Sequence, residues 1–300
     1  MGSPLRLTLP DGPDGRNAWR EVVDEFEAAD AAMSRFRDSS ELTRLNRLAG
    51  TGRALAVSRR LRIGLISAER ARRVTEGRFD PRVLDDLDRL GDRGAPLGGP
   101  PPGDRAGQPA RLGPAVRNAG RGALVVDHRI DLGGIGKGLT LRWAAARLER
   151  IGCATFLLEA GGDLVSRGRP PDADAWTVGI EDPTQNAGHL AAIVSRPGSG
   201  AIATSSIRIN QWRIDGRVVH HIVDPATGEP GGSGLQSVTV AGPDSAWAEV
   251  WSKVLFLAGR DGIVAEARAR GIAAWWVDTS GTLAMTPAAR LTTAWVAGEA

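Results

Sequence analysis

One glycine-rich stretch, Arg129–Leu148, constrains this chain more than any other part of its sequence. It reads R-I-D-L-G-G-I-G-K-G-L-T-L-R-W-A-A-A-R-L: a short apolar run, three crowded glycines and then a helix-forming segment. Glycines at such a turn permit positive φ angles and let a ligand approach the main chain. The N-terminus of the following helix offers free N–H groups and a positive dipole end, which suit phosphate. The stretch therefore predicts either a phosphate-binding turn or a strand-to-helix turn that only packs.

Two known phosphate-binding motifs are excluded. A Walker A loop ending at Lys137 would need glycine where Asp131 stands and Ser or Thr where Gly138 stands. A Rossmann fingerprint would need its third glycine at Leu139. Glu159 lies at a suitable distance to bind a ribose, but the segments that follow have the pattern of strands and hairpins rather than alternating βα units. Dinucleotide binding on a Rossmann unit is therefore kept only as a rival interpretation.

Composition and charge exclude several classes of protein. The chain has 300 residues, 42% of them hydrophobic, which is enough for a sizeable core. Its net charge of +3 reflects many arginines offset by nearly as many acids, so the charge gives no argument for nucleic-acid binding. The first residues contain no basic-then-apolar leader, and no long apolar span follows. We expect a cytoplasmic protein with no nucleic-acid and no membrane partner.

Hydrophobic periodicity predicts a mixture of helices and strands. Helices are expected at Asn17–Phe36, from a Ser40 cap through Asn46, and at Leu61–Val74, Arg82–Leu90, Leu139–Glu149, Ser245–Leu257 and Asp261–Arg268. Strands are expected at Leu5–Leu9, Ala54–Val57, Ala123–Val126, Arg129–Leu132, Thr155–Leu158, Trp176–Ile180, Ala191–Ser195, Ala201–Ser206, Gln211–Ile214, Arg217–Val223, Ser237–Ala241 and Ala273–Val277. Residues 91–114, rich in Pro and Gly, predict a poorly ordered surface loop. No repeat or linker divides the chain, so we predict an α+β fold in which residues 1–300 form a single domain, built on antiparallel sheet with flanking helices.

Seven short motifs, in the same order along nearly the whole chain, resemble those of the ApbE family, the FAD:protein FMN transferases. Each motif is weak by itself, and their shared order makes the resemblance specific. They are the M-G-S opening at Met1, M-S-R-F with S-S-E-L…N within Met33–Asn46, F-D-P-x-V at Phe79–Val83, D-L-G-G-I-G-K-G at Asp131–Gly138, A-G-G-D at Ala160–Asp163, A-T-S at Ala203–Ser205 and H-I-V-D-P-x-T-G at His221–Gly228. The resemblance implies an ApbE-like, T-fold-like domain.

The resemblance also implies an activity: binding of FAD and transfer of its FMN half to a Ser or Thr hydroxyl of an acceptor protein, with release of AMP. Phe36 stands where the family often has a flavin-stacking Tyr, and its aromatic ring preserves that function. His221 would act as general base or phosphate contact, and strand alternation should turn His220 the other way. By motif position the implied FAD site comprises Met1, Phe36, Asp131, Lys137, Gly162, Asp163, Thr204, Val223 and Asp224. Without the resemblance, residues of these types are more often structural than functional, and this applies to Lys137, Asp163, His221 and Asp224.

The chain departs from the family pattern in the helix after Ser237–Ala241. There the family has A-D-A-x-x-T, whose Asp and Thr hold Mg²⁺ together with a main-chain carbonyl of the glycine turn, here that of Gly134. This chain instead reads A-E-V-W-S-K, which places Glu249 and Lys253 at the two ligand positions. Glu249 can still reach a metal, whereas a charged Lys253 cannot ligate one and repels it. Either the Mg²⁺ site is lost or Lys253 points away, and we hypothesise that Lys253 takes over part of the metal's role.

Three functions remain open at this point. The first is the FMN transferase. The second is a flavin-binding protein of the same fold with lost or altered transfer, acting as a carrier, a regulator or an FAD hydrolase. The third is a structural or interaction protein that keeps the scaffold without a ligand. An FAD spectrum on purification would exclude the third function, and AMP release together with a flavinylated partner would separate the first from the second.

Overall fold

The structure, a computed structural model, describes residues 4–10, 15–92, 113–120, 122–184, 188–195, 198–214 and 216–298. Contacts between Cα atoms group the chain into two compact units. Apart from Met1, the first unit comprises Phe26–Gly136 and Asn210–Gly231, and the second comprises Gly2–Glu25, Lys137–Ile209 and Gly232–Ala300. Helices α1 (Gly15–Met33) and α5 (Gly136–Arg150) each contain residues of both units.

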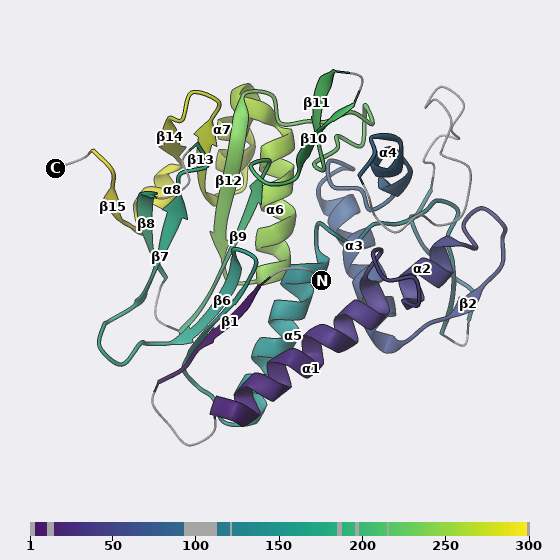
Figure 1. Ribbon diagram of the computed structural model, residues 1–300, viewed down its shortest axis with the longest axis horizontal. Helices are drawn as coiled ribbons and strands as arrows, with labels where there is room; N and C mark the ends of the chain where they lie inside the picture. The colour runs from purple at the N-terminus through teal and green to yellow at the C-terminus, as the bar shows by residue number, and fades with distance from the viewer. Residues whose placement is uncertain are drawn as a thin grey trace. The chain divides into compact units, whose positions relative to one another are not determined.

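A seven-stranded sheet forms the centre of the second unit (Figure 1). In spatial order its strands are β1 (Leu5–Thr8), β5 (Phe156–Ala160), β6 (Asp163–Gly168), β9 (Gly198–Ser206), β12 (Leu235–Gly242), β13 (Ala273–Asp278) and β14 (Leu283–Met285). Each neighbouring pair is antiparallel. An antiparallel sheet with flanking helices confirms the predicted α+β class.

Helix α6 (Ser245–Leu257) packs against β9 and β12 and lies along them in Figure 1. The Asp244 side chain caps it by accepting a hydrogen bond from the Trp247 N–H. Val250 and Val254, one turn apart on the same face, are fully buried. Burial of each such side chain contributes roughly 1.5–3 kcal/mol. Helix α6 is therefore fixed both at its start and along its length, which matters because it carries two of the predicted site residues.

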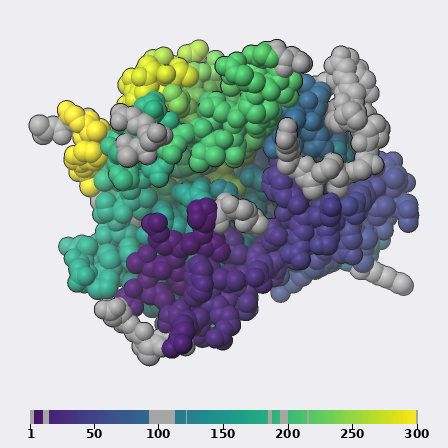
Figure 2. All heavy atoms as spheres, viewed as in Figure 1, coloured from purple at the N-terminus to yellow at the C-terminus, as the bar shows by residue number. Residues whose placement is uncertain are grey.

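A second, three-stranded sheet in the order β15 (Thr293–Val296), β8 (His189–Ser195) and β7 (Trp176–Glu181) packs on the seven-stranded sheet. Trp275 of β13 is fully buried in the core between them, together with Ile193 and Ile202. Its Nε1 donates a hydrogen bond to Thr293 Oγ1 at 2.9 Å. Strand β15 lies on the surface of this unit, coloured yellow in Figure 2. Helices α7 (Gly259–Ala269) and α8 (Pro287–Arg290) pack on β13.

The described part of the first unit consists of helices and two small sheets. Its remaining elements are α2 (Glu41–Asn46), α3 (Arg59–Val74), α4 (Leu84–Arg89), the sheet β2 (Leu55–Ala56)–β4 (Ala123–Val125)–β3 (Arg117–Asn118) and the hairpin β10 (Gln211–Ile214)–β11 (Arg217–His220). Ser40 caps α2 by accepting a hydrogen bond from the Thr43 N–H at 3.0 Å, as the sequence predicts. Leu87 and Leu90 pack on Val219 and Trp212 of the hairpin, which joins the segments at residues 84–90 and 211–220.

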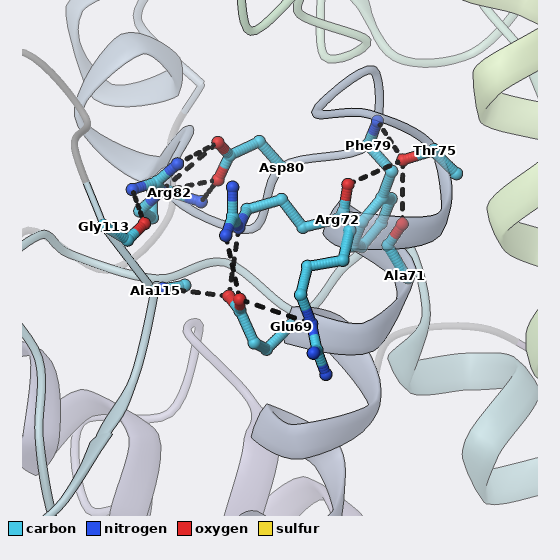
Figure 3. Close-up of polar contacts among 10 residues, drawn as sticks. Glu69, Ala71, Arg72, Thr75, Phe79, Asp80, Arg82, Gly113 and Ala115 are labelled. Carbon is cyan, nitrogen blue, oxygen red and sulfur yellow. Dashed lines mark hydrogen bonds and ion pairs between the residues drawn. The ribbon is translucent and has the colours of Figure 1, made fainter.

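The F-D-P segment ends in a buried ion pair. Arg82 Nη2 lies 2.7 Å from Asp80 Oδ2, and both side chains are under 10% exposed. Figure 3 shows this pair next to an ion pair of helix α3. Between the two residues, the Pro81 carbonyl accepts a hydrogen bond from the Asp131 N–H at 2.7 Å. The motif therefore helps to fix the main chain at the start of the glycine turn.

Two predicted strands require correction. Residues 129–132 form no strand with Ala123–Val126, because the Asn46 side chain binds both backbone groups of Ile130. The Asn46 Nδ2 donates a hydrogen bond to the Ile130 carbonyl, and its Oδ1 accepts one from the Ile130 N–H, each at 2.8 Å. The predicted strand Arg217–Val223 ends at His220. Most of the predicted loop 91–114 and the predicted site residue Met1 lie outside the described residues. Among the described residues, no helix is both long enough and apolar enough to cross a membrane.

Candidate functional site

Lys137 lies in the first turn of helix α5 and is held by Asp163, the first residue of β6. Lys137 Nζ is 2.6 Å from Asp163 Oδ2, and Asp163 Oδ1 accepts a hydrogen bond from the Thr204 N–H at 2.9 Å. The side chain of Asp163 is 3% exposed and that of Lys137 is 27% exposed, so a buried carboxylate anchors the ammonium of a partly buried lysine. The turn before Asp163 uses Gly161 and Gly162 at φ angles of 58° and 90°, which favour glycine. Four residues of the predicted site are thus connected in the second unit.

Glu249 of helix α6 lies beside the start of helix α5. Its Oε2 accepts a hydrogen bond from the Gly138 N–H at 2.7 Å, and Ser245 Oγ donates to the Gly138 carbonyl at 2.6 Å. A Cβ at position 138 would lie 2.3 Å from the Ser245 carbonyl oxygen, so the two helices can meet here only through glycine. Glu249 Oε1 is buried and has no hydrogen-bond partner among the described residues.

The glycine turn itself differs from expectation. Gly133, Gly134 and Gly136 do not adopt positive φ angles. The Gly136 N–H donates to the Leu132 carbonyl at 2.7 Å, and the Gly138 N–H is taken by Glu249. The prediction of free N–H groups for phosphate is therefore wrong at these two positions, because protein acceptors already occupy them. Gly134, the predicted carbonyl ligand, is buried.

The charges around Glu249 are balanced by the only two lysines of the sequence, Lys137 and Lys253. Burial raises the pKa of Glu249 to about 8, and nearby Asp163 adds to the rise, whereas the two lysines and the Gly138 N–H oppose it. Burial alone would lower the pKa of Lys137, but the carboxylates of Asp163 and Glu249 outweigh it and the net shift is upward. Lys137 is therefore a stable cation at neutral pH.

Hydroxyl pairs join β9, the strand that carries Thr204, to the neighbouring strand β12 and to helix α6. Thr204 Oγ1 lies 2.9 Å from Thr239 Oγ1 of β12. Ser252 Oγ donates its proton to the Glu249 carbonyl at 2.9 Å, so Ser205 Oγ must donate to Ser252 Oγ, also at 2.9 Å. These contacts hold Glu249 and Thr204 in a defined relation within the second unit.

In the first unit, Phe36 and Asp131 are linked through Arg35. Phe36 is 59% exposed, an unusual position for a large aromatic side chain. Arg35 Nε lies 3.0 Å from Asp131 Oδ1, and Asp131 Oδ2 accepts a hydrogen bond from the Gly133 N–H at 3.0 Å. Arg35 lies inside the M-S-R-F motif but is not among the predicted site residues.

The residues after β11 form an irregular segment of the first unit. His221 is half-buried, and its Nδ1 lies 3.3 Å from the Asn210 carbonyl. His220, the last residue of the strand, is buried at 9% exposed. Val223 is buried and Asp224 begins a hydrogen-bonded turn. The more accessible of the two histidines is therefore His221, and its catalytic role stays a prediction.

The predicted site residues fall into two sets, one in each unit. The second unit brings together Lys137, Gly162, Asp163, Thr204, Glu249 and Lys253, and the first contains Phe36, Asp131, Gly134, His221, Val223 and Asp224. Within the described part of the chain, no group of three or more His, Cys, Asp or Glu side chains is placed to hold a metal ion.

Comparison with known sequences gives matches over most of the chain. The ApbE family model matches residues 1–276. An FAD:protein FMN transferase of Salmonella typhimurium is 31% identical over 296 residues, which are 94% of this chain and 83% of the relative. One of Klebsiella pneumoniae is 30% identical over 270 residues, 87% of this chain and 77% of the relative.

Solved structures match the fold equally widely. The flavin transferase ApbE from Vibrio cholerae has a TM-score of 0.79 at 26% identity, covering 97% of this chain and 96% of that one. An ApbE protein from Thermotoga maritima has a TM-score of 0.83 with the same coverage, and at 24% identity it supports the fold alone.

Proposed function

Because the chain belongs to the ApbE family, we propose that it is a flavin transferase that binds FAD and transfers FMN to a Ser or Thr of an acceptor protein, releasing AMP. The observation that carries the proposal is the near full-length match to relatives named FAD:protein FMN transferase. FAD and a protein acceptor are therefore the two partners, and neither a nucleic acid nor a membrane enters the reaction. A cytoplasmic location stays a prediction.

The reaction is a displacement at phosphorus. The acceptor hydroxyl oxygen attacks the phosphorus of the FMN half, the P–O bond to the AMP half breaks, and AMP leaves with the bridging oxygen. The hydroxyl proton passes to a base, for which His221 is the candidate. Such a reaction requires chiefly that the protein position the groups and neutralise charge.

Lys137 is suited to the neutralising role. Its side chain is partly exposed at the positive end of helix α5, and Asp163 keeps its ammonium in one position. One positive charge about 4 Å from a phosphate oxygen interacts with roughly 4 kcal/mol at an effective dielectric constant of about 20. On the flavin side, the exposed ring of Phe36 offers a stacking surface, and the carboxylate of Asp131 offers a hydrogen-bond acceptor.

The residues around Glu249 do not fit a divalent metal ion. One carboxylate oxygen of Glu249 already accepts the Gly138 N–H, and Asp163 is paired with Lys137. Lys253 acts electrostatically on Glu249, so a divalent ion there would face two ammonium groups with few free oxygen ligands. We therefore assign part of the charge-neutralising role of Mg²⁺ to Lys253, which replaces a divalent ion incompletely.

Incubation with FAD and candidate acceptor proteins tests the function. Mass spectrometry should find FMN attached to a Ser or Thr, and chromatography should find AMP in equal amount. Lys137→Met should slow transfer at least tenfold, since a few kcal/mol of charge interaction is lost. Arg150→Met, which removes a cation from the other end of helix α5, serves as the matched control and should act as the wild type.

Lys253, at the position where the family pattern has Thr, favours one alternative: a flavin-binding protein of this family with lost or altered transfer. FAD binding without AMP release would identify a carrier or regulator. AMP release without a modified acceptor would identify an FAD hydrolase. Absence of FAD binding by the wild-type protein would contradict all three activities.

A further inference from the structure

Arg35 connects three segments of the first unit through one planar group. Its Nη2 lies 2.7 Å from Asp92 Oδ2, just after helix α4, and its Nε lies 3.0 Å from Asp131 Oδ1, just before the glycine turn. The side chain of Arg35 is 7% exposed, and those of Asp92 and Asp131 are 16% and 12% exposed. Two carboxylates thus share one largely buried guanidinium, whose flat fork suits this geometry better than an ammonium would.

The same guanidinium supports the ring of Phe36. Arg35 Cζ lies 4.1 Å from the centroid of that ring, within the range of a cation–π contact. Because Arg35 is buried and Phe36 is 59% exposed, the guanidinium covers the inner side of the ring and leaves its outer side open. The Phe36 N–H also donates to Ser34 Oγ at 3.2 Å, which restrains the main chain.

Arg35 is not fully satisfied by these contacts. Its Nη1 is buried and has no hydrogen-bond partner among the described residues. An unpaired, buried, charged donor is costly, so a fold gains nothing in stability from leaving it there. Such a cost is tolerated where it arranges groups that act on a ligand.

We infer that Arg35 is a positioning residue for flavin binding: it holds the carboxylate of Asp131 and the ring of Phe36 in one arrangement before FAD arrives. This role rests on the proposed function, since Phe36 and Asp131 are the implied flavin contacts. Groups fixed in advance lose less conformational entropy when the ligand binds, so loss of Arg35 should weaken affinity although Arg35 need not touch FAD.

Three variants separate this role from a purely structural one. Arg35→Met removes the cation, and Arg35→Lys keeps the charge without the fork. Arg35→Met with Asp92→Asn also removes the charge of Asp92, one of the two carboxylates that lose their partner, and leaves Asp131 in place as the implied flavin contact. We expect the double variant to melt at a higher temperature than Arg35→Met, while its dissociation constant for FAD stays about tenfold above that of the wild type. Arg35→Lys should give an intermediate affinity.

Fluorescence titration supplies a second readout, because stacking on Phe36 should quench flavin emission and shift its absorption. The double variant should bind FAD with weaker quenching than the wild type. Arg37→Met is the matched control: Arg37 is an exposed cation two residues away that pairs with Asp30 and Ser39. It should leave both affinity and quenching unchanged.

The outcomes are distinct. Wild-type affinity and quenching in the double variant would overturn the positioning role and leave the proposed function intact. Equal loss in Arg35→Met and Arg37→Met would also overturn it, since general charge would then explain the effect. A wild-type protein that binds no FAD would overturn the proposed function and this role together.

Discussion

At the scale of single residues, Glu249 couples the candidate site to stability. Its pKa is raised from an ordinary 4.5 to about 8, so between these values the folded chain binds more protons than the unfolded chain. The free energy of unfolding should therefore fall as pH rises from about 4.5 to about 8, by at most about 1.4 kcal/mol per pH unit. The stabilisation linked to the protonated Glu249 is fully present below about pH 4.5 and is lost above about pH 8.

Glu249→Gln cannot ionise and should remove this slope. Urea unfolding measured at several pH values between about 5 and 8 checks the expectation. Glu27→Gln, at an exposed position of helix α1, is the control and should keep the wild-type slope. A slope that is the same in all three proteins would show that other groups cause it.

The sequence identified many of these residues but few of their partners. Lys137, Asp163 and Thr204 lie in short motifs, and the structure connects all three. The contact between Glu249 and Gly138 joins positions 111 residues apart, and no local pattern predicts such a pair. Asp92 likewise carries no motif, because its role depends on the distant Arg35.

At the scale of secondary structure, helices α5 and α6 depend on one glycine. Gly138→Ala would place a Cβ against the Ser245 main chain, where no flexible side chain can move away. We expect a loss of about 1–3 kcal/mol in the free energy of unfolding, typical of overpacking. Gly136→Ala is the matched control, since the nearest atom to its Cβ would be 3.9 Å away and alanine favours helix. Thermal unfolding of both variants tests this, and equal stability would contradict the close contact.

Helices and strands were predictable where the hydrophobic periodicity extends over many residues. They were not predictable where a distant side chain takes the backbone hydrogen bonds. The predicted bounds of α6, Ser245–Leu257, are those of the structure, because a capping Asp244 and a buried stripe mark them locally. The strand predicted at residues 129–132 is absent because the Asn46 amide takes the backbone bonds of Ile130. Strand β6 was not predicted, since its glycine turn read as a ligand contact rather than as a hairpin.

At the scale of the whole molecule, both lysines of the sequence belong to the second unit. Lys137 and Lys253 are the only lysines of the sequence, while all other basic side chains are arginine or histidine. Both act on the buried Glu249. A lysine ammonium is a compact charge that suits phosphate, so its confinement to this cluster agrees with a role in binding the pyrophosphate of FAD.

Because the sequence has only two lysines, their NMR signals can report directly whether Mg²⁺ binds near Glu249. Reductive methylation with ¹³C-formaldehyde labels the two lysines and the N-terminus and keeps their charge, and Lys253→Met assigns the signals. FAD should shift both lysine signals in the NMR spectrum, whereas Mg²⁺ alone should shift neither. EDTA should not change the affinity for FAD.

In the double variant Glu249→Asp with Lys253→Thr, which restores oxygen ligands, Mg²⁺ should shift the Lys137 signal. Mg²⁺ shifts of both lysine signals in the wild type, with FAD binding lost on chelation, would show that a metal occupies this helix and that Lys253 points away from it.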